Sequence, residues 1–393
     1  MTVKKPTPDW SPTSGDVLRD QVAAYDAMRE RCPVAYSDLL GWSLFRHGDV
    51  MRALNDPETF SNVISSRRAV PNGMDPPEHS EYRRIIELYF QPERMEAFEP
   101  ECRAIAVELV QALLERDAVE LMEQLAHPFA VRVQCGFLGW PAFMHQPLHH
   151  WILKGHGATA AQDRAAMADL AREFEGYVDA MLQARRAAGD QASDDVTTSL
   201  MRQEAWGRQL ELGEIVSILR NWTAGEIGTI STAVGILAHY LAVCPELQQR
   251  LRDEPLLLPA AIDEMLRLHG PLVENRRVTT REVEIGGRKI AAGERISLNW
   301  IAANRDGRVF ADPAEFRLDR DPATNLLYGA GIHVCPGAPL ARLELRLVME
   351  ELLGRTASID PMPGAPATRA VYPVSGFAVL PLRLRLTTVF ETR

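Results

Sequence analysis

The stretch Tyr-Gly-Ala-Gly-Ile-His-Val-Cys-Pro-Gly, residues 328–337, is the most informative part of the chain. It places one cysteine, Cys335, in a loop with three glycines, just before a helix predicted over residues 338–353. The free N–H groups and the positive dipole end of a helix N-terminus favour an anion such as a thiolate, which is a strong metal ligand. Glycines also let a backbone lie close to a flat ligand. Taken alone, Cys335 is more often a buried and inert cysteine, so its neighbours carry the argument.

With those neighbours, the stretch resembles the Phe-Gly-x-Gly-x-His-x-Cys-x-Gly motif of the cytochrome P450 superfamily, with Tyr328 in place of the phenylalanine. The resemblance implies a mainly α fold with a minor β portion. It also implies a haem b (iron protoporphyrin IX) whose iron is ligated by Cys335, with Tyr328, Gly329 and Gly337 around the cofactor. The hydroxyl of Tyr328 needs a polar partner, so the iron is expected to be tuned differently from that of relatives with phenylalanine.

Further motifs of the same superfamily follow in the expected order. Glu264 and Arg267 form an ExxR pair on one helix face, and Arg320 lies fifteen residues before Cys335, where the family supplies a second arginine. A lone ExxR pair has little weight, because solvated helices carry many of them. In this order, the resemblance implies a buried Glu–Arg–Arg cluster that holds the segment presenting Cys335.

The two propionates of a haem need cations or hydrogen-bond donors. His79 and Arg83 are four residues apart on a predicted helix, like the HxxxR pair of the family, and Arg277 opens a predicted β region. His333 completes the set that the resemblance implies for cofactor binding. Each of these residues alone is equally compatible with an ordinary surface histidine or arginine.

The predicted helix over residues 215–243 contains Ala-Gly-Glu-Ile-Gly-Thr at positions 224–229. Two glycines in the middle of a helix cost about 1 kcal/mol each, so a compensating gain is expected. The resemblance implies a groove where oxygen binds, with Thr229 and Glu226 as catalytic residues of proton delivery. Close packing against another helix is the alternative explanation for the glycines.

Two departures from the family pattern stand out. The family usually has an acid directly before the threonine, and here that position is Gly228. Glu226 lies about 200° around an ideal helix from Gly228, so it reaches the same site only if the helix opens locally. The connection over residues 61–74 is also short, so one wall of the substrate pocket is expected to be reduced.

Composition limits the partners of this 393-residue chain. Its net charge of −10 argues against nucleic-acid binding. Five scattered cysteines without CxxC spacing favour a reducing, cytoplasmic compartment. The sequence contains no run of about 18 apolar residues and no apolar signal-peptide segment, so we expect no membrane association. We expect a flexible N-terminal lead-in at residues 1–20 and a single haem-binding P450 domain over 21–393.

The pattern of apolar residues is mostly helical over residues 16–188, and again over 213–244 and 256–268. Alternation over residues 277–298, with a Gly-Gly turn at 286–287, predicts a small β region. Residues 361–386 are predicted to form loops and short strands.

The resemblance implies a haem-thiolate monooxygenase that hydroxylates or O-dealkylates an organic substrate with O2 and two electrons from a redox partner. Arg342 and Arg346, with Arg84, are expected to meet a ferredoxin or a flavin/iron-sulfur reductase. Among relatives, the chain most resembles haem domains of bacterial self-sufficient fusions with a phthalate-dioxygenase-type reductase, either as a stand-alone relative or as an excised haem domain. A peroxide-driven peroxygenase and a non-catalytic haem sensor are the alternatives.

The predicted pocket walls are mostly apolar, which favours a small to medium apolar substrate, aromatic ones included. Glu274 and Asn275 are its candidate polar anchors. Four histidines, at positions 145, 149, 150 and 156, are interpreted as surface residues without a metal.

Overall fold

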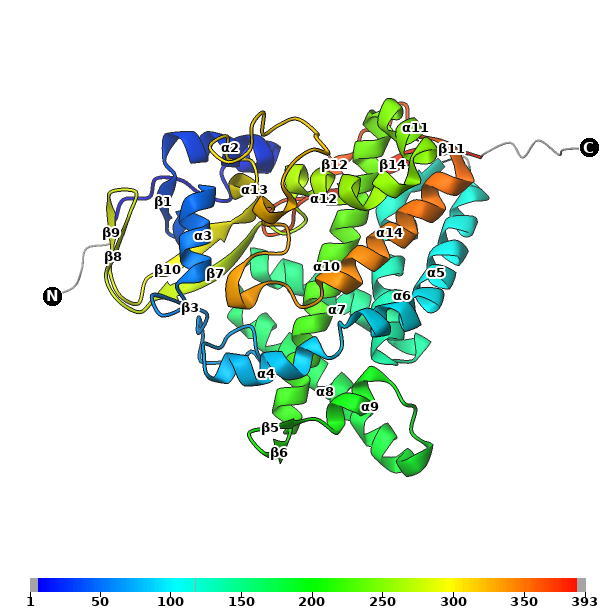
Figure 1. The fold of residues 1–393 in the computed structure, drawn as a ribbon, viewed down its shortest axis with the longest axis horizontal. Helices are drawn as coiled ribbons and strands as arrows, with labels where there is room; N and C mark the ends of the chain where they lie inside the picture. The colour runs from blue at the N-terminus through cyan, green and yellow to red at the C-terminus, as the bar shows by residue number, and fades with distance from the viewer. Residues whose placement is uncertain (1–5, 117, 387–393) are drawn as a thin grey trace, which may run out of the picture. The chain divides into compact units, whose positions relative to one another are not determined.

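The computed structural model describes residues 6–116 and 118–386, which divide into two compact units (Figure 1). The sheet unit comprises residues up to Ser80, Asp263–Cys335 and Arg369–Ser375. The helix unit comprises Glu81–Ile262, Pro336–Thr368 and the residues from Gly376 onward. Three elements contain residues of both units: α4 (Glu78–Glu87), α12 (Leu258–His269) and β12 (Thr368–Arg369).

The sheet unit is built on a five-stranded sheet of order β1-β2-β10-β7-β3. The apolar faces of its strands bury a core that includes Trp42, Leu44, Phe60, Ile296 and Leu298. Its elements are α1 (Gly15–Arg19), α2 (Gln21–Arg31), β1 (Val34–Ser37), β2 (Gly41–Leu44), α3 (His47–Asn55), β3 (Phe60–Ser61), β7 (Glu274–Thr279), β8 (Val283–Ile285), β9 (Arg288–Ile290), β10 (Arg295–Asn299), α13 (Trp300–Ala303) and the 3₁₀ turns Pro322–Thr324 and Gly331–His333.

The sequence pattern missed β1, β2 and β3, because each is at most four residues long and lies among helices. β2 pairs in parallel with β10, with Trp42 opposite Ile296, so its partner comes about 250 residues later in the chain. The predicted hairpin is confirmed: β8 and β9 are joined by Gly286 and Gly287, whose φ angles are +56° and +75°.

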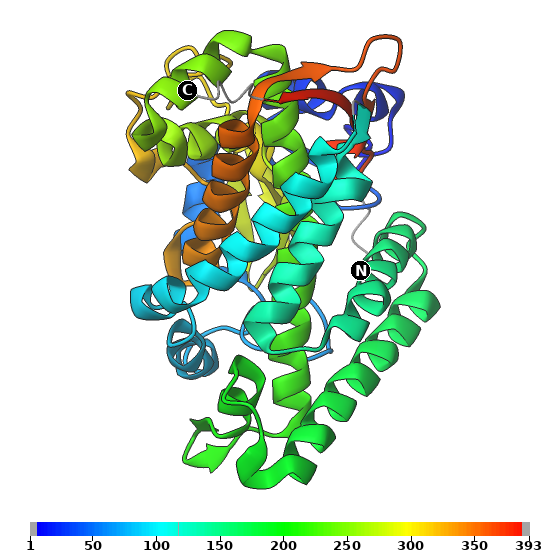
Figure 2. The ribbon, with the colours of Figure 1, turned by 90° about the vertical axis from the view of Figure 1, so that its right-hand side faces the viewer.

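In the helix unit, α10 (Leu212–Val243) packs against α6, α14 and α8, and Figure 2 shows α5 and α14 running side by side. The other elements are α5 (Pro92–Leu114), β4 (Ala118–Glu120), a π-helical turn (Met122–Ala126), α6 (His127–Leu138), α7 (His145–Ala160), α8 (Arg164–Ala188), α9 (Val196–Met201), β5 (Glu204–Ala205), β6 (Arg208–Gln209), α11 (Pro245–Asp253), α14 (Ala338–Arg355), β11 (Thr356–Pro361), β13 (Phe377–Val379), β14 (Pro381–Leu386) and the 3₁₀ turns Ala142–Met144, Gly189–Gln191 and Pro255–Leu257.

Helix α10 is apolar because it forms the centre of the helix unit. Among the described residues it is the one helix long and apolar enough to cross a bilayer, but 67% of its most apolar window is buried inside the protein. Its N-terminus is closed by a capping box in which Glu211 and Glu214 each bond the other's backbone N–H. The prediction of a mainly α fold with a minor β portion is confirmed.

Candidate functional site

The loop around Cys335 is shaped by two glycines of the sheet unit. Gly329 and Gly331 have φ angles of +71° and +69°, where side chains are strained. A Cβ on Gly331 would lie 2.5 Å from the carbonyl oxygen of Leu54, so no larger residue fits. The N–H of Cys335 donates to the carbonyl of Tyr328 over 2.8 Å, which closes the loop and leaves the thiol exposed.

Two of the predicted propionate ligands, His79 and His333, meet in the same unit. Their ring centroids lie 4.1 Å apart at an angle of 54°. His79 is buried and His333 is half-buried two residues before Cys335. Two imidazoles in contact beside a thiol form a compact set of nitrogen donors.

Arg277 on β7 is a buried cation with little compensation. Its guanidinium donates to the carbonyl of Arg276 over 2.8 Å, and no ion pair of Arg277 with a carboxylate is present within residues 6–116 and 118–386. Burial lowers the pKa of Arg277 to about 10, and the charge of Asp75 acts in the opposite direction. An incoming anion would therefore gain a desolvated partner.

The predicted Glu–Arg–Arg cluster is confirmed. Arg267 binds both oxygens of Glu264 at 2.7 and 2.9 Å, and Arg320 Nε donates to Glu264 Oε1 over 2.9 Å. The remaining donors of Arg267 bond the carbonyls of Asn304, Pro313 and Glu315. This saturated network ties α12 to the irregular segment that leads into the Cys335 loop.

The groove residues of α10 lie in the helix unit. The helix is unbroken through residues 224–229, and the Thr229 hydroxyl donates to the Gly225 carbonyl over 2.5 Å. A Cβ on Gly225 would meet nothing within 4 Å, whereas one on Gly228 would lie 3.5 Å from Nε2 of His156 on α7. This histidine, interpreted from sequence as a surface residue, therefore lies over the position where the family has an acid.

Glu226 faces α14, whereas Gly228 faces α7. The Glu226 carboxyl group interacts with that of Glu344 on α14, and Glu226 Oε1 and both Glu344 oxygens are enclosed. Burial raises the pKa of both groups, and the Glu226 charge raises that of Glu344 further. Beside them, burial followed by the charge of Glu226 raises the pKa of the Cys102 thiol to about 12. Sequence reasoning missed Glu344 as the partner of Glu226.

The chain was compared with known protein families. A sequence model of the family described as Cytochrome P450 matches residues 140–356, more than half of the chain. The chain belongs to the cytochrome P450 family. It is therefore a haem-iron monooxygenase, an oxidoreductase that acts on organic substrates with O2 and electrons from a redox partner.

Relatives of this P450 cover nearly its full length. Cyclomarin C epoxidase of Salinispora arenicola is 32% identical over 353 residues, which are 85% of this chain and 88% of that protein. The methyl-branched lipid omega-hydroxylase of Mycobacterium tuberculosis is 31% identical, with 86% and 84% covered. Among solved structures, CYP109Q5 from Chondromyces apiculatus has a TM-score of 0.86 at 28% identity and covers 96% of this chain and 98% of its own.

The residues of this P450 fit the family's haem. The exposed Cys335 thiol suits an iron ligand, and the buried Arg277 with little compensation suits a propionate, with His79 and His333 as further donors. Arg83 follows His79 by one turn of α4 and donates to Glu87 over 2.7 Å. Gly337 is the N-cap of α14.

Several other predicted contacts are already occupied. The Glu274 carboxylate accepts bonds from Arg276, Ser297 and Tyr372, and Asn275 Oδ1 accepts one from the indole of Trp300. Both candidate anchors are thus used within the sheet unit. Of the expected docking cations, Arg346 pairs with Glu99 and Glu350, and Arg84 pairs with Glu81.

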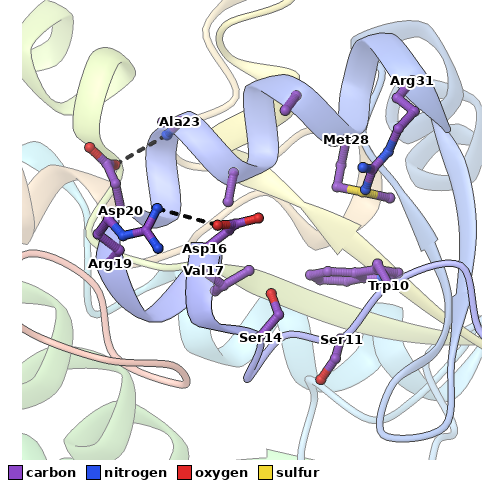
Figure 3. Close-up of a pocket in the computed structure, with 12 residues that line it drawn as sticks. Trp10, Ser11, Ser14, Asp16, Val17, Arg19, Asp20, Ala23, Met28 and Arg31 are labelled. Atoms are coloured by element: carbon purple, nitrogen blue, oxygen red, sulfur yellow. Dashed lines mark hydrogen bonds and ion pairs between the residues drawn. The ribbon is translucent and has the colours of Figure 1, made fainter.

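A surface hollow near the N-terminus is separate from these residues. It is lined by residues 10–31, with Trp10 and Met28 on one side and the Arg19–Asp16 ion pair on another (Figure 3). None of its lining residues belongs to the candidate site.

Proposed function

We propose that this P450 hydroxylates or O-dealkylates a small to medium apolar organic molecule, aromatic ones included. The observation that carries the proposal is the exposed Cys335 thiol in a loop of the sheet unit that also holds His79, His333 and the buried Arg277. These groups match the two needs of a haem, an axial thiolate and partners for its propionates.

When bound, the haem supplies the oxygen chemistry, and thiolate ligation favours O–O cleavage. The chain contributes Cys335 as the iron ligand and Tyr328, Gly329 and Gly337 around it. Residues His79, Arg83, Arg277 and His333 would hold its propionates.

Thr229 and Glu226 are the proposed residues of proton delivery. The Thr229 hydroxyl donates its hydrogen bond to the Gly225 carbonyl. Its oxygen can therefore accept a hydrogen bond from water or from a hydroxyl of the substrate. Glu226 has its carboxyl beside Glu344, so a proton from Glu226 would start from the α14 side of the helix.

The electron donor is proposed to be a ferredoxin or a flavin/iron-sulfur reductase in the cytoplasm, as in the self-sufficient fusions that the sequence resembles. Arg342 and Arg346 on α14, with Arg84, form the proposed docking face. Because Arg346 and Arg84 already pair with glutamates, an acidic partner must compete with those ion pairs.

An apolar substrate agrees with what the relatives are named for. These include a methyl-branched lipid omega-hydroxylase, and solved neighbours hold testosterone or erythromycin B. Glu274 and Asn275, the two candidate polar anchors, already accept hydrogen bonds within the protein, which also favours an apolar ligand.

The test is the absorption spectrum of the purified protein, reduced and exposed to carbon monoxide. We expect the red-shifted Soret band of a thiolate-ligated ferrous carbonyl, absent in Cys335→Ser and retained in the control Cys32→Ser. Turnover of an alkyl aryl ether such as 7-ethoxycoumarin with a surrogate ferredoxin and its reductase then tests the reaction. A wild type without haem, or a band unchanged in Cys335→Ser, would overturn the proposal.

A peroxide-driven peroxygenase is a second candidate, because Gly228 leaves α10 without the usual acid. Peroxide-supported oxidation of the same ether, sustained over many turnovers without a reductase, would favour it. A haem protein that forms the thiolate carbonyl but converts no substrate with either oxidant would instead be a sensor.

A further inference from the structure

An imidazole occupies the space above the missing acid of α10. His156 on α7 places Nε2 3.5 Å and Cε1 4.0 Å from the position of a Cβ at Gly228. A side chain at 228 would contact this ring, so the glycine leaves room for it. The ring therefore lies next to the turn of α10 that carries Thr229.

The His156 ring is held by packing rather than by hydrogen bonds. Within the described parts of the chain, no hydrogen bond of its nitrogens to protein is present. Burial lowers the pKa of His156, so the ring is neutral at pH 7. A neutral imidazole has one donor and one acceptor nitrogen, and both are available to water or a ligand.

His127, His149 and His150 form a row of imidazoles on α6 and α7, and His156 is near enough to this row to lower the pKa of His127. His149 lies seven residues before His156, on the same face of α7. Its ring centroid is 5.2 Å from that of His127 on α6 and 6.1 Å from that of the exposed His150. His149 Nε2 is buried without a hydrogen-bond partner.

The surroundings of His127 and His156 favour uncharged rings. Burial lowers the pKa of His127, His149 and His156 lower it further, and Glu123 and Glu120 act in the opposite direction. For His156, burial is the cause that lowers the pKa. A neutral imidazole can pass on a proton without accumulating positive charge.

We propose that His156 is the proton-transfer residue that takes the place of the acid missing at Gly228, and that His127, His149 and His150 connect it to solvent. This inference rests on the proposed function. A proton enters the ring at Nδ1 and leaves from Nε2 toward the α10 turn of Thr229, so the imidazole ends neutral with its tautomer exchanged. The two electrons of the reaction come from the redox partner, and the oxygen atom that is not inserted leaves as water with two such protons.

The first test measures coupling, as product formed per reduced nicotinamide consumed, with 7-ethoxycoumarin and a surrogate ferredoxin and its reductase. We expect at least a fivefold loss of coupling in His156→Ala, with the excess electrons recovered as hydrogen peroxide. His150→Gln, at the exposed end, should lose less than twofold. Equal coupling in wild type and His156→Ala would overturn the inference.

A compensating variant separates proton transfer from packing. His156→Ala combined with Gly228→Asp puts a carboxyl at the position where the family has one, in the space that the ring vacates. We expect coupling to return to within about twofold of wild type. The control is His156→Ala combined with Gly228→Ala, which fills part of the same space without a titratable group. If this control restores coupling and the Gly228→Asp combination does not, His156 acts by packing and not by proton transfer.

A spectroscopic readout does not depend on turnover. In the reduced carbonyl complex, we expect the C–O stretching band to shift as the pH is lowered below 7 in wild type and His150→Gln, because burial lowers the pKa of His156, and to be pH-independent in His156→Ala and His156→Phe. If either variant does not load haem, His156→Gln replaces it. A thiolate carbonyl whose band titrates alike in all variants overturns this inference alone, whereas a wild type with no such carbonyl overturns the proposed function.

Discussion

Two buried glutamate sites in this P450 have opposite surroundings. Glu264 in the sheet unit receives four hydrogen bonds: two from the side chain of Arg267, one from that of Arg320 and one from the backbone N–H of Arg317, and Oε1 accepts three of them. Glu226 and Glu344 in the helix unit have each other and the Cys102 thiol, and no arginine or lysine bonds Glu344 in the described chain.

The difference shows that one fold can hold a buried glutamate that stays ionised and a pair of buried glutamates that share a proton. A buried carboxylate whose oxygens are bonded to guanidinium groups is fixed in one state, and loss of a partner leaves a charge without compensation. Two carboxyls in contact cannot both ionise, so one holds a proton. The first arrangement supports the segment before Cys335, and the second stores a proton next to α10.

The largest effect is expected at the Glu264 cluster. Arg267→Ala removes the partner of a buried carboxylate and three bonds to backbone carbonyls, so we expect a loss of about 3–5 kcal/mol in the free energy of unfolding and poor haem retention. Urea denaturation of the haem-loaded protein measures it. Arg317→Ala, whose side chain pairs with Asp319 at the surface, is the matched control and should change stability by less than about 0.5 kcal/mol.

The opposite result is expected at the carboxyl pair. The unfolded Glu344 titrates near its ordinary value of 4.5 while burial raises the folded pKa, so above pH 4.5 the unfolded chain releases a proton that the folded chain keeps. Stability is complete below that pH and falls as pH rises toward the folded pKa. Glu344→Gln removes this loss, so we expect the variant to be more stable than wild type by about 1–2 kcal/mol at pH 8 and equal to it at pH 4.5.

Glu264→Gln is the matched comparison for that substitution, because it leaves Arg267 without its anion and should destabilise at pH 8. Urea midpoints of both variants across pH 4.5–8 distinguish the two sites. A loss of stability in Glu344→Gln at pH 8 would contradict the protonated pair.

A smaller effect concerns coupling within the pair. Glu226→Gln also removes the unfavourable contact between the two carboxyl groups. In the double variant Glu226→Gln/Glu344→Gln, the second substitution should therefore increase the free energy of unfolding by less than the first. We expect a coupling energy of about 0.5–2 kcal/mol from the double-mutant cycle at pH 8. Strictly additive effects would mean that the two groups do not share a proton.

The smallest effect is chemical rather than thermodynamic. Because burial and Glu226 raise the pKa of Cys102 to about 12, its thiol should stay unmodified by iodoacetamide at pH 8 in the folded protein. Peptide mass mapping should find Cys102 alkylated only after unfolding, whereas the half-buried Cys32 should be alkylated before it. Rapid labelling of native Cys102 would show that this side of α10 opens readily.

The Glu264–Arg267 pair and the glycine loop before Cys335 could be predicted from sequence because these motifs are local, whereas His79, Arg277 and His333 were grouped only by the family resemblance. The spacing of Glu264 and Arg267 on one helix face, and of the glycines before Cys335, fixes those contacts wherever the rest of the chain lies. Strand β2 could not be predicted in this way, since its partner β10 is remote in sequence.

The helix-unit contacts depend on which helices pack against α10. A signal for Glu344 was present: it stands four residues after Leu340 and four before Val348, both buried, so an acid occupies an apolar face. His156 gave no comparable signal, because its role depends on the absence of a side chain at Gly228 on another helix.

The close approach of Gly331 to the backbone of Leu54 has a practical consequence for engineering. A combinatorial library that randomises the Cys335 loop will lose nearly every clone with a side chain at 331, because the obstacle is a carbonyl oxygen at the end of α3 and cannot be removed by mutation. Grafting the loop into another scaffold would therefore require transplanting the last turn of α3 with it. The useful unit of recombination is this pair of segments rather than the ten-residue motif.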